Sequence, residues 1–196
     1  MIRTFAVAAL LVTSSACGSR STCGPGPERL AFRDGTGALR VRLAAATKPH
    51  DLDLCDAAGQ RLGTITEEGD VLRLYDRAHA ERLRAERADA TELVGPAGEA
   101  LRLYRADHTL RLLRPDGVPA ASFNEHDGAV YVSGPGGAPV AKAAARDADA
   151  VLAAPDGAVQ AYLVPSPGLS AAAVFAIEGL AVEERFLLAL HLSRRH

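Results

Sequence analysis

Between residues 29 and 165 the apolar positions occur in short runs, and many of these runs alternate apolar with polar side chains. The alternation is clearest at 39–43 (LRVRL) and 101–103 (LRL). Successive side chains of a strand point to opposite faces, so this pattern is typical of strands with one buried and one solvated face. The pattern predicts a series of short antiparallel strands of roughly five to seven residues each.

Turn-forming residues separate these runs at an interval of about 20 residues. Gly, Asp and Pro are the residues that tight turns require. Seven groups form one set: 34–37 (DGTG), 56–59 (DAAG), 76–79 (DRAH), 95–98 (GPAG), 114–117 (RPDG), 134–137 (GPGG) and 154–157 (APDG). A second, more acidic set lies between them, at 49–51, 67–70, 88–90, 107–108, 125–128 and 147–149. Two turns per period predict about seven antiparallel hairpin units and about fourteen strands.

The pattern becomes helical after Pro165-Ser166-Pro167. Residues 169–177 (LSAAAVFAI) are apolar on nearly all sides, which predicts an enclosed helix. Gly179 is expected to end it, and Glu183 and Glu184 to open a second helix at 182–194. The chain is therefore predicted to be mainly β, a closed barrel-like or repetitive sheet that the apolar C-terminal helical segment, 166–196, fills or caps.

The first sixteen residues have the pattern of a signal peptide that is removed. Arg3 precedes an apolar run at 5–12 (FAVAALLV), and small residues at 13–16 lead directly to Cys17. The sequence Ser14-Ser15-Ala16-Cys17 resembles the bacterial lipoprotein signal. That resemblance implies that Cys17 is acylated and that 17–28 form a lipidated flexible tether. A secretory signal cleaved near Ala16, with a free Cys17, is the alternative.

The position after Cys17 adds an expectation about location. Gly18 stands there, which resembles sorting to the outer membrane, with the protein body facing the periplasm. A lipid anchor of this kind would place the protein in a bacterial cell envelope. Arg outnumbers Lys 20 to 2, which indicates a GC-rich genome.

Two further cysteines remain, Cys23 and Cys55. An even pair in an oxidising compartment predicts a disulfide, and two free thiols are the alternative. Zinc is not expected, because two cysteines without closely spaced histidines do not make a site.

The β-rich body followed by an apolar helix also resembles a known family. The turns Asp116-Gly117 and Asp156-Gly157, with the helix at 169–177, resemble the tubby C-terminal-like barrel shared with scramblase-like and LURP-one-related proteins. The resemblance covers about residues 50–180. It implies a closed antiparallel barrel threaded by a hydrophobic helix, and binding of anionic lipid. The stretch GDVLRLYD at 69–76 resembles one copy of the tyrosine–aspartate repeat of bacterial shell proteins, which is an alternative to the tubby-like barrel. A propeller and an open β-roll are further alternatives.

Composition excludes several function classes. The chain of 196 residues has 48% hydrophobic and 23% charged residues, which excludes a disordered protein. A net charge of −2 argues against nucleic acid as a partner, and 5% aromatics without Trp argue against a base- or sugar-stacking platform. No nucleophile, phosphate-loop or metalloprotease motif is present, so neither an enzyme nor a cofactor is expected.

Two groups of charged residues are candidate sites. Arginines in the predicted strands would form an outward basic stripe that binds anions: Arg40, Arg42, Arg73, Arg82, Arg84, Arg102, Arg105 and Arg111. Ordinary solubilising charge is the alternative. The acidic turns would share one rim, where His108, His126 and Asp127 are weak candidates for a metal, although charged turns are usually just solvated.

These observations predict a non-enzymatic envelope lipoprotein that binds an anionic lipid or another envelope polyanion. The alternative is a structural or assembly scaffold with protein partners. The oligomeric state is left open.

Overall fold

The computed structural model of the chain describes residues 22–24, 26–86, 91–94, 100–106 and 109–194. Within these residues it contains fourteen strands, two α-helices and two short 3₁₀ turns. The strands are β1 (Glu28–Asp34), β2 (Leu39–Ala45), β3 (Asp51–Asp56), β4 (Arg61–Glu68), β5 (Val71–Asp76), β6 (Glu81–Glu86), β7 (Thr91–Val94), β8 (Ala100–Ala106), β9 (Thr109–Leu113), β10 (Pro119–His126), β11 (Ala129–Ser133), β12 (Pro139–Arg146), β13 (Asp149–Ala153) and β14 (Val159–Val164). The helical elements are η1 (Pro135–Gly137), α1 (Leu169–Ala173), η2 (Val174–Ala176) and α2 (Val182–Ser193).

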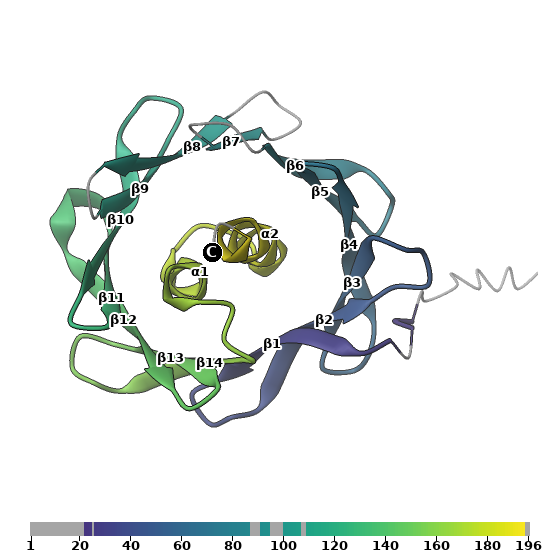
Figure 1. Cartoon of the computed structure of the whole chain (residues 1–196), viewed down its shortest axis with the longest axis horizontal. Helices are drawn as coiled ribbons and strands as arrows, with labels where there is room; N and C mark the ends of the chain where they lie inside the picture. The colour runs from purple at the N-terminus through teal and green to yellow at the C-terminus, as the bar shows by residue number, and fades with distance from the viewer. Residues whose placement is uncertain (1–21, 25, 87–90, 95–99, 107–108, 195–196) are drawn as a thin grey trace, which may run out of the picture.

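Each strand pairs antiparallel with its neighbour in sequence, and β1 pairs with β14, so the sheet closes into a barrel (Figure 1). Closure leaves no strand edge unpaired. The prediction of a mainly β chain of antiparallel hairpins forming a closed barrel-like sheet is confirmed. The turns alternate between the two ends of the barrel. Mouth A is the end with turns 34–37, 56–59, 76–79, 114–117, 134–137 and 154–157, and mouth B is the opposite end.

The turns of mouth A share one backbone design. In each, the N–H of the fourth residue donates to the carbonyl of the first, as from Gly37 to Asp34 at 2.8 Å and from Gly157 to Ala154 at 2.9 Å. The fourth residue has a positive φ, which is 80° at Gly117 and 88° at Gly157. Each of these hairpins also has a register shift beside the turn. A tight turn followed by a bulge explains why glycine recurs at that position, and in 134–137 the third residue, Gly136, also has a positive φ of 77°.

Aspartate holds these turns from two positions. In the first three hairpins the first residue is Asp, and its Oδ1 accepts the N–H groups two and four residues later, as Asp56 does from Ala58 and Gln60. In 114–117 and 154–157 the third residue is the Asp, and Asp116 accepts from Val118 N at 2.9 Å. The recurring Asp therefore satisfies backbone donors within the turn itself.

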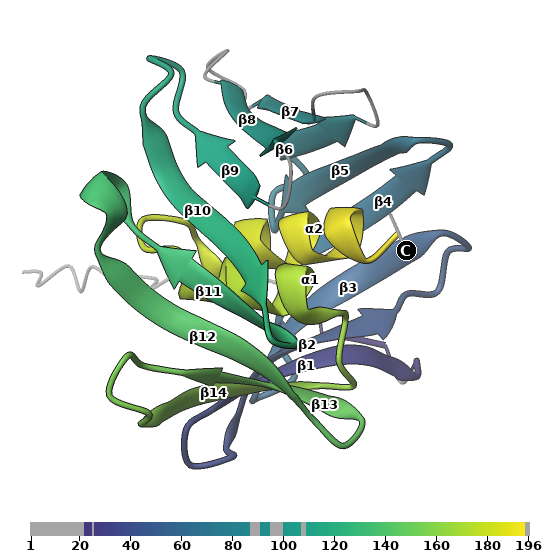
Figure 2. The same cartoon turned by 60° about the vertical axis from the view of Figure 1, so that its left-hand side comes forward.

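The C-terminal segment lies inside the barrel (Figures 1 and 2). It begins near mouth B, where Ser166 N donates to Ala148 O. It then runs through α1 to mouth A and returns through α2. Phe175 stacks on Phe32 of β1 with ring centroids 5.2 Å apart and meets Phe186 of α2 edge-on at 5.0 Å. The prediction that an apolar helical segment fills the sheet is confirmed.

One arginine joins the two inner helices. Arg185 of α2 donates from Nη1 to Phe175 O at 2.9 Å and from Nε to Leu180 O at 3.1 Å. Burial lowers the pKa of this guanidinium. At the start of α2, Glu184 Oε2 accepts from Ala181 N at 2.9 Å. The linker between the helices is thus held by both charged residues.

Several predicted features lie outside the described residues: the signal peptide at 1–16, Cys17, and the turns at 88–90, 95–98 and 107–108. Among the helices that the structure does describe, none has the length and apolar character needed to cross a membrane.

Candidate functional site

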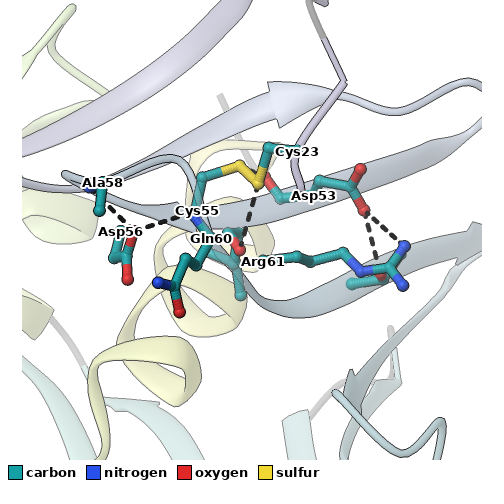
Figure 3. Close-up of a disulfide and its surroundings, with 9 residues drawn as sticks. Cys23, Asp53, Cys55, Asp56, Ala58, Gln60 and Arg61 are labelled. Carbon is teal, nitrogen blue, oxygen red and sulfur yellow. Dashed lines mark hydrogen bonds and ion pairs between the residues drawn. A yellow bond between two sulfur atoms is a disulfide. The ribbon is translucent and has the colours of Figure 1, made fainter. Parts of the chain in front are cut away.

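The predicted disulfide is present between Cys23 and Cys55 of β3, with Cα atoms 6.1 Å apart. Neighbouring backbone contacts support it, because Cys23 N donates to Gly59 O at 3.0 Å and Thr22 forms a bridge with Gln60. Figure 3 shows the linkage on the outside of the β3–β4 hairpin. The segment that follows Cys17 is therefore fastened to the outer face of one particular hairpin.

Three of the predicted anion-binding arginines are ion-paired with carboxylates of their own hairpins. Arg40 lies 2.7 Å from Asp34, and Arg84 Nε lies 3.2 Å from Glu86. Arg73 contacts Glu81 at 2.9 Å and Glu68 at 3.2 Å, and its hydrogen bond to Glu81 raises its pKa. Such pairs weaken the field that an external anion would meet.

Three others do not join a common surface. Arg42 faces outward beside the disulfide, opposite Cys55 in the β2–β3 ladder. Arg82 lines a hollow at mouth A together with Leu74 and Glu183. Arg105 is opposite the core residue Leu110, and so belongs to the inward-facing row at mouth B, where it is exposed. Arg105 therefore does not share the outward face that the predicted stripe requires, and anion binding by the other predicted arginines stays a prediction.

Arg102 and Arg111 are the remaining two predicted arginines. A further outward cation lies beyond them on β12, next to an exposed tyrosine on β11. Arg111 of β9 is opposite Tyr104 of β8, whereas Arg102 is at the edge, opposite Glu92 of β7. On β11 and β12, Tyr131 is opposite Lys142, whose Nζ lies 5.3 Å from the ring centroid. Tyr104 is 47% and Tyr131 39% exposed.

Tyr104, Arg111, Tyr131 and Lys142 form what we call the basic–tyrosine wall. Two cross-strand rows connect its members, and the other described positions in these rows are neutral: Ser122, Ser133, Asn124, Thr109 and Ala153. Cations beside exposed tyrosines suit an anionic, partly dehydrated surface. The alternation in 129–133 and 139–146 is a signal that Tyr131 and Lys142 face outward, although neither belongs to the predicted arginine stripe.

The acidic turns give no metal centre among the described residues. His50, Asp70 and Asp127 all lie at mouth B, as expected for alternate turns of a meander. His126 Nε2 lies 3.0 Å from Asp127, but both side chains are more than 70% exposed. Within the part of the chain that is described, no three His, Cys, Asp or Glu side chains gather as metal ligands. His108 is outside that part.

No protein-family model matches this sequence, and neither does any curated protein. Among solved structures, the X-ray structure of a protein from Arabidopsis thaliana is similar with a TM-score of 0.40 and 14% sequence identity. The similarity covers 80% of this chain and 91% of that chain. The functional assignment therefore rests on the residues of this chain.

Proposed function

We propose that this protein is a lipid-anchored, non-enzymatic module of a bacterial envelope that binds phosphate-bearing polyanions through its basic–tyrosine wall. The observation that carries the proposal is the position of that wall relative to the disulfide. In the closed order of fourteen strands, β10 is seven strands from β3 in either direction. The wall surrounds β10, so it lies across the barrel from the Cys23–Cys55 linkage (Figure 1).

The distances determine which surface the wall would meet. Cys23 is six positions after Cys17, and a fully extended chain over six positions spans about 20 Å. A fourteen-stranded barrel with strands about 4.8 Å apart, tilted by about 40°, averages roughly 28 Å across. An anchor at Cys17 would thus hold β2–β4 close to its own membrane and turn the wall away from it. The partner is an anionic surface or polymer on the opposite side.

The chemistry of the wall supports a phosphate-bearing partner. Arg111 offers a planar guanidinium with several donors, and Lys142 offers a compact ammonium group. Tyr104 lies beside Arg111 and Tyr131 lies beside Lys142, so each cation has a neighbouring phenolic ring that packs against polymer or headgroup atoms. The phosphates could belong to a lipid surface or to a soluble polymer, and the experiment separates these sources.

The test uses the secreted chain from Gly18 onward with its disulfide intact. One arm measures flotation with vesicles of phosphatidylglycerol and phosphatidylcholine, and the other measures binding of soluble polyphosphate. Both arms are run from about 50 to about 500 mM NaCl, because screening weakens exposed charge interactions. Binding in either arm that salt suppresses supports the proposal and identifies the source of the phosphate.

The matched variants are Arg111→Glu/Lys142→Glu and Arg29→Glu/Arg77→Glu. They change the net charge equally, but Arg29 on β1 and Arg77 in the β5–β6 turn lie outside the wall. The wall variant should lose at least tenfold in affinity and the control less than twofold. Equal losses, or absence of binding to both probes at low salt, contradict the proposal.

A scaffold with protein partners is the second candidate, and the filled interior favours it. The helices α1 and α2 occupy the space inside the barrel, so the protein would act through its surface. Cross-linking in envelopes that contain the anchored chain would test this function. A specific protein captured equally by the wild type and by the wall variant would support the scaffold.

A further inference from the structure

A second hollow lies on the opposite side of the barrel from the basic–tyrosine wall. Its floor consists of four outward side chains from β3 and β4, arranged in two cross-strand pairs, Asp53 with Thr64 and Asp51 with Thr66. Its volume is about 410 Å³, which lies in the lower part of the range of small-molecule sites, about 300–1,000 Å³. Besides these four side chains, Lys48, Arg61 and Tyr75 line the hollow.

Asp53 is the unusual residue of this floor. It is only 6% exposed although it lies on the outer face of the barrel. Thr64 Oγ1 donates to its Oδ1 at 3.0 Å, and Arg61 Nη1 lies 3.8 Å from the same oxygen (Figure 3). Among the described residues, both contacts use Oδ1, which leaves Oδ2 to accept a further donor. A carboxylate with spare acceptor capacity and little access to water is prepared for a charged donor.

The Thr66 hydroxyl is a second polar group in the floor with unused hydrogen-bonding capacity. Its oxygen is buried, and it has no hydrogen-bond partner among the described residues. Buried polar groups in native proteins are nearly always paired, so an exception needs a missing partner. Thr66 also lines the hollow, so a rotation of its side chain would let a ligand there accept the hydroxyl hydrogen.

The charges around the hollow are balanced. Asp51 and Asp53 provide two carboxylates, whereas Lys48 and Arg61 provide two cations. Tyr75 adds an aromatic ring opposite Thr64. A simple anion would meet the carboxylates and a simple cation would meet Lys48 and Arg61. A molecule that carries both charges finds a partner for each.

We infer that this hollow binds a small zwitterion with an ammonium group close to a carboxylate, as in an amino acid or a dipeptide. The ammonium group lies against Asp53 Oδ2 and the Tyr75 ring. The ligand carboxylate faces Arg61 and Lys48, and Thr66 donates its hydroxyl to the ligand. This site is independent of the basic–tyrosine wall.

The disulfide helps to shape this site. Cys55 is two residues beyond Asp53 on the same strand, and Cys23 covers the outer face there (Figure 3). Farther along the segment, a side-chain carbon at Gly24 would lie 3.9 Å from Thr47 Oγ1 at the edge of the hollow. The fastened segment therefore borders the hollow on the side of Thr47.

The experiment titrates the secreted chain, with its disulfide intact, by isothermal calorimetry. The zwitterionic probes are glycine, alanine and alanyl-alanine, and the single-charge probes are ethanolamine and acetate. The inference predicts that at least one zwitterion binds about tenfold more tightly than either single-charge probe. If no zwitterion binds at about millimolar concentration, or if ethanolamine or acetate binds as well, the inference is wrong.

Two variants test the assigned contacts. Asp53→Asn retains an acceptor for Thr64 but removes the charge, and it should weaken zwitterion binding at least tenfold. Thr66→Val should weaken binding without lowering Tm, because the hydroxyl has no hydrogen-bond partner within the described part of the chain. Thr109→Val on β9 is the matched control and should leave the affinity unchanged. Unchanged affinity in both Asp53→Asn and Thr66→Val contradicts the inference.

Discussion

Phe32, on the first strand, stacks on Phe175, in the turn between the two inner helices, with ring centroids 5.2 Å apart. Phe175 is 3% exposed and also contacts Phe186 of α2. Three aromatic rings from the start, the inner turn and the end of the chain thus share one cluster. Because β1 also pairs with β14, this cluster lies beside the seam that closes the barrel.

Replacing Phe175 with alanine should lower the free energy of unfolding by about 3–5 kcal/mol, since it removes a buried ring and leaves a cavity. Phe175→Leu should lower it less, because most of the apolar volume remains. Urea unfolding followed by circular dichroism measures both values. A chain that ends at Val164 should not unfold cooperatively, because it lacks the helices that fill the sheet. A cooperative transition in that shortened chain would show that the helices are peripheral.

The Cys23–Cys55 disulfide closes a loop of 32 residues that contains β1, β2 and most of β3. The chain-entropy model assigns such a loop about 3–4 kcal/mol of stabilisation. Cys23→Ser/Cys55→Ser should therefore lower Tm by about 10 °C, as measured by calorimetry. Addition of a reductant should lower the Tm of the wild type to that of the variant. A reductant effect that persists in the double variant would have another cause.

The bulged turns of mouth A require a positive φ at their fourth residue. A Cβ at Gly117 or Gly157 would meet no atom within 4 Å, so a substitution there introduces backbone strain without crowding. Valine at either position should cost about 1–2 kcal/mol, and asparagine less. His79 occupies the equivalent position with φ at 59°. His79→Gly should raise stability by up to about 1 kcal/mol. Chemical denaturation of these variants measures the changes, and equal stability of all of them would contradict the turn assignment.

Asp34 makes stability depend on pH in the acid range. The Thr36 hydroxyl, helped by backbone N–H groups and Arg40, lowers the Asp34 pKa from 3.8 to about 2. The folded state therefore favours ionised Asp34, and this contribution is complete above the unfolded value of 3.8 and is lost as pH falls through about 2. Wild type should have a higher Tm than Asp34→Asn at neutral pH, and the difference should shrink as pH approaches 2. Thr36→Val, which removes the largest cause, should weaken this dependence. A constant difference across that interval would contradict the assignment.

The local design of the barrel could be predicted from the sequence. A turn such as 34–37 is held by contacts within five residues, from Asp34 to the N–H groups of Thr36 and Ala38. The residues that make these contacts therefore recur visibly about every 20 positions. The apolar stretch at 169–177 indicated an enclosed helix because its composition alone excludes a solvated face. The disulfide followed from the number of cysteines.

Only the tertiary structure decided which side chains share a surface. Sequence alternation places Lys142 and Tyr131 outward, but their opposition depends on the register of β11 and β12. The ion pairs of Arg40, Arg73 and Arg84 likewise depend on which carboxylates lie near each guanidinium. The alternation of apolar and polar residues does not predict those neighbours. Register and pairing depend on packing between strands, and no local pattern encodes them.

Closure of the barrel is a second property that the sequence pattern did not determine, because it pairs the first strand with the last. The period of turns indicated fourteen strands, yet the pairing of Ala31 with Val164 joins the two ends of the meander. That pairing places the disulfide and the basic–tyrosine wall on opposite sides of the barrel. The sequence thus determined the hairpins, the inner helix and the disulfide, whose causes are local or compositional. The tertiary structure decided the sites, because each one depends on cross-strand register, and the position of the wall opposite the disulfide depends also on closure.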